Sequence, residues 1–310
     1  MPDTLLMGLS TVFAGTAIAA VRDEVKIMPL LLSMLFVMAA QLASNCTYVF
    51  NDLRNHHGNT ALEEIAGRLN RQEDTELYGI LKIIAGVTTI FAITIGFMLT
   101  SYCGAWSLLL GALLFILAYL NVQGPMPLVC TSFGPLITYL IFGPIGVVGT
   151  FLLQFSDSTF AILSWFDIGP AVFLGLSMGF MAANVHIAIE YQHYRMNLLT
   201  HRISIVTELG RKFSRWAVLL GGFGMWAFFY TMVSSHYCQY PLIDMIAPTI
   251  SLIVNCIVWY KMRKFSPVNK GIRPSVLAIA NMAFLGLVTL LLFMVIGTPD
   301  SAIRDYYTMK

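Results

Sequence analysis

The sequence predicts an all-α protein that crosses a lipid bilayer about nine times. Of its 310 residues, 57% are hydrophobic and 11% are charged, with a mean hydropathy of +0.75. About a quarter of the residues of a soluble domain are charged, so a chain this apolar has no way to cover a water-exposed surface. Apolar runs of roughly 20 residues, long enough to span a bilayer as a helix, recur along the chain. These runs must be helical, because backbone groups in lipid need internal partners.

The apolar runs leave no room for a separate soluble domain, so residues 1–310 are predicted to form a single transmembrane domain. The first run is short. The fifth contains Pro135 and Pro144, and proline interrupts helices. The predicted spans cover residues 5–21, 27–50, 78–100, 104–122, 129–153, 169–189, 216–235, 241–260 and 275–296.

The basic residues predict the orientation of these spans. With nine spans, most of the 18 lysines and arginines fall in loops on one side of the membrane. The other side carries only Arg22, Lys26, Arg304 and Lys310. Because cytoplasmic loops are rich in Lys and Arg, we expect a cytoplasmic N-terminus and an external C-terminus. The bias fits a bacterial inner membrane.

A polar stretch follows the second predicted span. Asn45, Asn51 and Asp52 lie near its end, and on a continued helix Asp52, Asn55 and His56 would share one face. Oxygen ligands at a helix end suit a hard cation such as Mg²⁺ that also bridges a diphosphate. Alternatively, the stretch is a solvated loop start with Asn and Asp as caps.

A second polar stretch, residues 184–210, begins inside the sixth predicted span. On a helix, Asn184, His186, Glu190 and His193 fall along one broad side. Polar groups at the end of an apolar span mark a cavity more often than a lipid-facing surface. The spacing of Glu190 and His193 is that of an E-x-x-H pair, which ligates iron or manganese in some helix bundles.

Five of the six histidines fall in these two stretches. If the stretches face each other, Asp52, His56, His186, Glu190 and His193 could converge. Imidazole together with carboxylate favours Zn²⁺, Fe²⁺ or Mn²⁺ over Mg²⁺. The alternative is a set of unrelated histidines at the membrane surface.

The basic loops allow two interpretations. Arg195, Arg202, Arg211 and Lys212 could clamp a diphosphate. They could equally enforce the topology and contact anionic lipid. Since the basic residues lie in short loops between spans, nucleic-acid binding is not expected.

The order of these features resembles the UbiA-type intramembrane aromatic prenyltransferases, in particular the branch that prenylates dihydroxynaphthoate for menaquinone. Asn51 and Asp52 match the N-D of the first Asp-rich motif. Tyr119 precedes a G-P-x-P-L loop, and Asn184 and Gly210 lie at the two ends of the second motif. The segments that carry the resemblance are residues 2–5, 13–17, 41–58, 119, 124–128, 142–144, 149–150, 184 and 202–210.

The resemblance implies nine helices around a central cavity that opens to the cytoplasmic side. It also implies Mg²⁺, a polyprenyl diphosphate donor and an aromatic acceptor of naphthoate or quinone type. Metal and basic residues would stabilise the leaving diphosphate, and an apolar cavity would keep water from the carbocation. Asp52 and Glu190 are then the expected catalytic acids. The expected substrate-binding residues are Asn45, Asn51, Asn55, Asn184, Arg195, Arg202 and Tyr119.

The chain departs from the family pattern at the metal-binding positions. Asn55 stands at the second Asp of the first motif, and the second motif reads Asn184-Val185-His186-Ile187, without its Arg and Asp. Three functions therefore stay open. One is a divergent prenyltransferase with few carboxylates. Another is a non-catalytic relative that binds a quinone or isoprenoid, or serves as a subunit of a membrane complex. The third is an enzyme with a His/carboxylate transition-metal site on the same scaffold.

Overall fold

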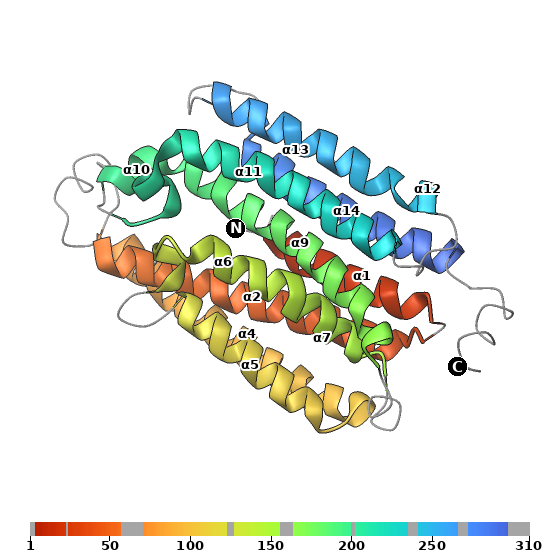
Figure 1. Ribbon diagram of the computed structural model, residues 1–310. Coiled ribbons are helices and arrows are strands. Elements are labelled where there is room, and N and C mark those ends of the chain that lie inside the picture. Colours follow the sequence, from red (N-terminus) through yellow and green to blue (C-terminus); the bar gives the residue numbers. More distant parts are fainter. Residues whose placement is uncertain are drawn as a thin grey trace, which may run out of the picture.

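The computed structural model describes residues 4–22, 24–56, 71–122, 127–155, 164–199, 202–234, 241–265 and 272–296. This part of the chain is helical apart from short turns and contains no strand, which confirms the all-α prediction. The long helices lie alongside one another in one bundle, and successive long helices reverse direction (Figure 1).

The helices begin and end close to the predicted spans. They are α1 (Leu5–Ala20), α2 (Ile27–His56), α4 (Arg71–Cys103), α5 (Trp106–Val122), η2 (Leu128–Cys130), α6 (Gly134–Leu140), η3 (Ile141–Ile145), α7 (Gly146–Leu152), α9 (Trp165–Gln192), α10 (Tyr194–Leu199), α11 (Ile205–Met232), α12 (Pro241–Asp244), α13 (Ile246–Lys264) and α14 (Pro274–Ile296).

Six helical segments among the described residues are long and apolar enough to cross a membrane. They are Ile27–Phe50, Gly79–Cys103, Gly134–Leu152, Asp167–Gln192, Leu242–Lys264 and Pro274–Met294. The apolar helices α1 and α5 are shorter, and the charged residues near the start of α11 interrupt its apolar character. The chain is therefore polytopic, whereas nine crossings stay a prediction.

Apolar side chains cover both the inside and the outside of the bundle. The main core lies between α1, α7, α9, α11, α13 and α14, where Phe151, Leu174, Met178 and Phe229 are buried. Helices α4 and α5 form one edge of the bundle (Figure 1), and many of their leucines, isoleucines and phenylalanines are exposed. Exposed apolar side chains over a whole helix surface are expected where lipid is the solvent.

The fifth predicted span is helical but broken in the middle. Its central residues, η3, form a π-helical turn that contains Pro144, and Gly143 has non-helical torsion angles. A Cβ on Gly143 would lie 2.6 Å from the Cα of Gly179 in α9, so the two helices cross at backbone contact. Small residues allow such close crossings in membrane proteins. The Thr11 hydroxyl of α1 donates to the Phe142 carbonyl over 2.9 Å, which satisfies a backbone group at the break.

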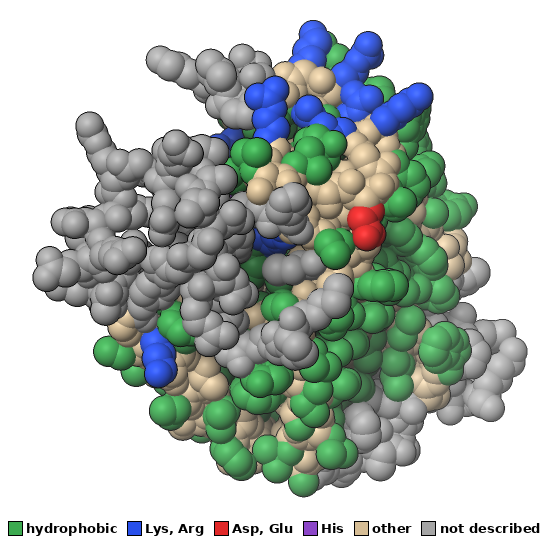
Figure 2. All heavy atoms as spheres, turned by 90° about the vertical axis from the view of Figure 1, so that its left-hand side faces the viewer, with side chains coloured by type: hydrophobic (Ala, Val, Ile, Leu, Met, Phe, Trp, Pro, Cys, Tyr) green, Lys and Arg blue, Asp and Glu red, His purple; other side chains and the backbone are tan. Residues whose placement is uncertain are grey.

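The two ends of the bundle differ in charge. Figure 2 shows Lys and Arg side chains gathered on the end where α2 and α13 finish and α6 begins, and the last turn of α13 alone supplies Lys261, Arg263 and Lys264. At the other end, Arg22 after α1 pairs with Asp167 in the first turn of α9. The basic end is the one predicted to be cytoplasmic. We call it the basic end below.

Candidate functional site at the basic end of the bundle

The second polar stretch contacts helix α2 near the basic end. The guanidinium of Arg202 lies over the ring of Tyr48, 5.0 Å from its centroid. Tyr48 belongs to the part of α2 that leads into the first polar stretch, and Arg202 belongs to the second. The contact therefore joins the second polar stretch to α2, one helical turn before Asp52.

Glu190 is buried beside Arg202. Its carboxylate accepts a hydrogen bond from Asn197 Nδ2 over 2.6 Å and one from Arg202 Nη2 over 3.4 Å. The chain folds back here because only one residue, His193, separates α9 from α10. After α10, the backbone N–H of Arg202 donates a hydrogen bond to the Asn197 carbonyl over 2.8 Å. We call Tyr48, Glu190, Asn197 and Arg202 the Arg202 cluster. A buried carboxylate held by a guanidinium and an amide fixes the position of both partners.

The start of α11 stabilises the segment that carries Arg202. Ser204 and Thr207 form a capping box at the first turn of α11. Glu208 accepts a hydrogen bond from Ser132, which ties this turn to the loop before α6. Gly210 then has φ +81° and ψ 161°, so the helix axis shifts before the membrane-crossing part begins. Only glycine adopts these angles readily, which explains the glycine that ends the second motif.

A second cation–π contact lies next to the Arg202 cluster. The Arg211 guanidinium stacks on the rings of Tyr191 and Tyr194, at 4.4 and 5.7 Å from their centroids. Arg195 and Lys212 are exposed. Four basic residues were predicted to clamp a diphosphate. Two of them, Arg202 and Arg211, contact aromatic rings of α2, α9 and α10.

Asn184 connects helices inside the core. Its Nδ2 donates to the Val218 carbonyl of α11 over 3.0 Å and to Asn255 Oδ1 of α13 over 3.1 Å. Asn255 donates to the same carbonyl over 2.9 Å. A Cβ on Gly221 would lie 2.4 Å from Asn184 Oδ1, so a glycine makes room for this amide. In this arrangement the amide of Asn184 holds α9 to α11 and α13.

The histidines of the second stretch point to different surroundings. His186 is half-buried and its Nδ1 lies 2.9 Å from Thr138 Oγ1 in α6. His193 is exposed, whereas Glu190 is buried. Within the described ranges, no three His, Cys, Asp or Glu side chains lie close enough to hold a metal ion. The side chains of Asn51, Asp52, Asn55 and His56 lie outside the described part, so their convergence with the second stretch stays a prediction.

The described residues do not fit the Mg²⁺ site that the resemblance implies. Mg²⁺ needs several oxygen ligands in a compact octahedral arrangement. Both carboxylate oxygens of Glu190 already accept hydrogen bonds, and one of the donors is the positively charged Arg202. A divalent cation bound to the Glu190 carboxylate would be repelled by the Arg202 guanidinium. The carboxylate of Glu190 is therefore placed to position Arg202.

Asn45 and Tyr119 lie on helices near the basic end. Asn45 Nδ2 donates to the Thr4 hydroxyl over 2.9 Å, and one turn earlier Gln41 donates to the Thr4 carbonyl. These bonds fix the start of α1 against α2. Tyr119 is exposed near the end of α5.

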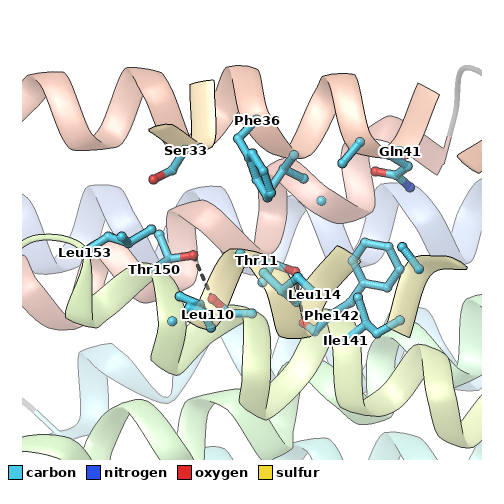
Figure 3. Close-up of a pocket in the computed structure, with 18 of the residues that line it drawn as sticks. Thr11, Ser33, Phe36, Gln41, Leu110, Leu114, Ile141, Phe142, Thr150 and Leu153 are labelled. Atoms are coloured by element: carbon cyan, nitrogen blue, oxygen red, sulfur yellow. Dashed lines mark hydrogen bonds between the residues drawn. The ribbon is translucent and has the colours of Figure 1, made fainter. Parts of the chain in front are cut away.

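An internal cavity extends along α2 toward the Arg202 cluster. Its empty volume is about 1030 Å³, including the space at its open side, and its wall comes from α1, α2, α4, α5, η3 and α7. Figure 3 shows Ser33 and Gln41 along α2, with Phe36, Leu110, Leu114 and Phe142 between them. None of the described residues that line the cavity is charged. We call it the α2 cavity.

Helix α2 joins this cavity to the polar site. Ser44 lines the cavity, Tyr48 contacts Arg202 one turn further on, and Asp52 follows after another turn of the same helix. At about 1.5 Å per residue, the step from Ser44 to Tyr48 is about 6 Å along the axis. The cavity and the Arg202 cluster therefore lie about one helical turn apart along α2.

The sequence analysis missed Tyr48, Asn197 and the cavity residues Gln41 and Asn121. Tyr48 precedes Asp52 by one helical turn, and Asn197 follows Glu190 by seven residues, so helical spacing from the two acids would have pointed to both. Gln41 and Asn121 are polar residues inside apolar spans, a signal that was available but was not used.

Comparison with known proteins supports the fold. No family model matches the chain, and no curated protein sequence matches it either. Among solved structures, the apo structure of a UbiA homologue from Aeropyrum pernix K1 is similar with a TM-score of 0.60 and 16% sequence identity. The similarity covers 93% of this chain and 98% of that one. The chain thus has the fold of that UbiA homologue along nearly its whole length.

A second solved structure is more distant. It is titled as a study of the biosynthesis of digeranylgeranylglyceryl phosphate synthase in membranes, and its TM-score is 0.48 with 15% identity. The alignment covers 96% of this chain and 97% of that chain.

Proposed function

We propose that this protein is a divergent intramembrane prenyltransferase that moves a polyprenyl group from its diphosphate to an aromatic acceptor of naphthoate or quinone type. The observation that carries the proposal is the position of the Arg202 cluster one helical turn beyond Ser44 of the α2 cavity, whose described wall residues are all uncharged. A polyprenyl diphosphate matches this arrangement, because it has a long apolar chain and a compact anionic head.

Each part of the site has a task in this reaction. The C–O bond between the prenyl C1 and the diphosphate breaks, and the diphosphate leaves with the electron pair. Arg202, held by Glu190 and Tyr48, is placed to bind this anion, because a guanidinium can donate two parallel hydrogen bonds to a phosphate. A ring carbon of the acceptor forms the new C–C bond at C1, and the proton on that carbon passes to the released diphosphate. The apolar cavity wall keeps water from the cation.

Asp52 extends the proposed site along α2. It follows Tyr48 by four residues, which is about one helical turn further along α2. With Asn51 and Asn55 on the same stretch, it is the expected place for Mg²⁺ to meet the diphosphate. When bound, the metal would supply additional positive charge for the leaving group.

The ion pair between Glu190 and Arg202 favours a second candidate function. The Glu190 carboxylate is neutralised by Arg202, and no group of three metal-ligating side chains occurs in the described ranges. A protein of this fold without a metal would hold an isoprenoid or a quinone without transferring it. It would then act as a lipid-binding protein or as a subunit of a membrane complex.

The test is diphosphate release by the purified, membrane-reconstituted protein. The assay contains geranylgeranyl diphosphate, Mg²⁺ and 1,4-dihydroxy-2-naphthoate, and the prenylated product is identified by mass spectrometry. Elemental analysis of the same preparation measures bound Mg, Zn, Fe and Mn. Mg²⁺-dependent release with product formation supports the transferase. Saturable binding of the diphosphate without release supports the binding protein, and stoichiometric Zn, Fe or Mn overturns both.

A further inference from the structure

Helices α11 and α13 lie side by side and run in opposite directions (Figure 1). Contacts at two levels fix how they pack. A Cβ on Gly222 of α11 would lie 2.1 Å from Asn255 Nδ2 of α13. Nearer the basic end, the rings of Trp216 and Trp259 are in contact, with their centroids 5.7 Å apart. The two tryptophans therefore share one level, about 8 Å before the end of α13 at Lys264.

Arg215 lies on the side of α11 that faces α13. It precedes Gly222 by seven residues, and residues seven apart share one face of a helix. This step places Arg215 about 10 Å nearer the basic end, and Trp259 is about 6 Å nearer the basic end than Asn255. Arg215 and Trp259 are both half-buried. They therefore belong to the same part of the contact between the two helices.

Two hydrogen-bond donors in this part lack an acceptor. Arg215 Nε and Trp259 Nε1 are covered by protein atoms and have no hydrogen-bond partner among the described residues. Both groups can only donate, and buried donors are nearly always hydrogen-bonded in folded proteins. Trp226, further along α11, shows the satisfied case, since its indole N–H donates to Thr249 Oγ1 of α13 over 3.2 Å. Because the side chains of Arg215 and Trp259 are partly exposed, a rotation can present both donors to acceptor oxygens of a ligand.

The positive charge of Arg215 is not balanced by a neighbouring acid. The sequence of α13 contains no acid, and the only acid of α11, Glu208, is hydrogen-bonded to the loop before α6. Lys212 is exposed and adds a second positive charge one turn before Trp216, on the same side of α11. Both cations follow the break at Gly210 and so lie at the positive end of the second part of α11, where the helix dipole disfavours them. A ligand with negative charge would balance them.

The surroundings of the two donors point to a lipid. Tryptophan rings near the ends of membrane helices lie at the level of the lipid head groups. On the same side of α11 as Trp216, Leu220 and Phe223 follow deeper in the bundle and are 65% and 50% exposed. An acyl chain covers such a surface, and basic residues at the membrane surface attract anionic head groups. An acidic phospholipid combines these two parts in one molecule.

We propose that the basic end of the contact between α11 and α13 binds an anionic phospholipid, through Lys212, Arg215, Trp216 and Trp259. The phosphodiester oxygens accept hydrogen bonds from the Arg215 guanidinium and the Trp259 indole, and Lys212 adds charge. One acyl chain lies along the exposed apolar side of α11. The site is separate from the Arg202 cluster, so the inference does not rest on the proposed function.

The test measures lipid binding to the delipidated full chain in detergent by native mass spectrometry. The probes are phosphatidylglycerol, phosphatidylcholine with the same acyl chains, and the soluble head group glycerophosphoglycerol. We expect phosphatidylglycerol to bind about tenfold or more tightly than phosphatidylcholine, since each of two basic residues at the membrane surface contributes roughly fivefold. Equal affinities for the two lipids would overturn the proposal. Glycerophosphoglycerol binding as tightly as the lipid would also overturn it, in favour of a site for a free phosphate.

Matched variants test the residues. Arg215→Gln should lower the affinity for phosphatidylglycerol about fivefold, because it removes one charge. Trp259→Phe keeps an aromatic ring but removes the donor, and should lower the affinity about threefold. Arg273→Gln is the control, because Arg273 is an exposed arginine just before α14 and gives the same change of charge. An equal loss in Arg215→Gln and Arg273→Gln would contradict the assignment.

Thermal unfolding checks that each variant is folded. Should Arg215→Gln fail to fold, Trp259→Phe decides, and unchanged binding of phosphatidylglycerol in that variant would overturn the proposal. The readout is lipid binding alone, so it is independent of diphosphate release. A selective lipid site in a protein without transferase activity would retain this inference and reject the proposed function.

Discussion

Arg202 stacks on Tyr48, and this contact links the segment between α10 and α11 to α2 near its end. The same guanidinium donates to the buried carboxylate of Glu190. The Arg202 guanidinium is thereby held from two sides, by the ring of Tyr48 on α2 and by the carboxylate of Glu190 on α9. A guanidinium fixed in this way needs little reorganisation to receive an anion.

Replacing Arg202 by glutamine should lower prenyl transfer about 100-fold, the usual effect of losing a group that stabilises developing charge. Diphosphate release from the reconstituted protein measures the effect. Arg263→Gln is the matched control, because Arg263 is an exposed arginine in the last turn of α13 at the same end of the bundle. Equal rates in the Arg202 variant and the wild type would remove Arg202 from the site.

Glu190→Gln should reduce turnover less than Arg202→Gln does, by about tenfold. Glutamine still accepts a hydrogen bond from Asn197 but loses the charge that orients Arg202. Because both residues act through one guanidinium, the double variant should be no slower than Arg202→Gln alone. Additive losses in this double-variant cycle would mean that Glu190 has a separate role, as the sequence analysis proposed. Thermal unfolding checks that each variant is folded.

The sequence was a good guide to the fold, because the bilayer leaves few solutions for a chain this apolar. Each predicted span overlaps helical residues. The differences are local. The helix containing the span 216–235 begins earlier, at Ile205, because Ser204 and Thr207 cap it and Gly210 absorbs a change of direction. The fifth span breaks at Gly143 and Pro144, where α9 approaches too closely for a side chain.

The site was less predictable, since helical spacing shows which residues share a side of a helix but not what that side meets. Asn184, His186 and Glu190 were placed on one broad side of α9. In the structure, the amide of Asn184 bonds to α11 and α13, the ring of His186 meets Thr138 of α6, and the carboxylate of Glu190 meets Arg202. These partners come from distant segments, and only the packing of the bundle decides among them.

Asp52→Asn should abolish turnover while the protein remains folded and inserted. The substitution keeps the size of the side chain but removes the charge expected to hold Mg²⁺ near the diphosphate. Turnover is measured over a range of Mg²⁺ concentrations, and recovery of the detergent-solubilised monomeric or oligomeric species by gel filtration reports folding. Full prenyl transfer in this variant would exclude Asp52 as a metal ligand.

Gly210→Ala should destabilise the protein by about 1–3 kcal/mol, because φ +81° with ψ 161° is a conformation that essentially only glycine adopts. A Cβ there would meet nothing within 4 Å, so the cost is one of backbone conformation rather than a clash. Gly86→Ala in the middle of α4 is the control, since it too has open space around its Cβ. Alanine at that helical position should be neutral or stabilising by up to about 1 kcal/mol.

Thermal unfolding of both variants in the same detergent makes the comparison. If Gly210→Ala also displaces Arg202, diphosphate release should fall at temperatures where the protein is still folded. Equal stabilities in the two variants would contradict the need for a glycine at the turn that follows the Arg202 segment.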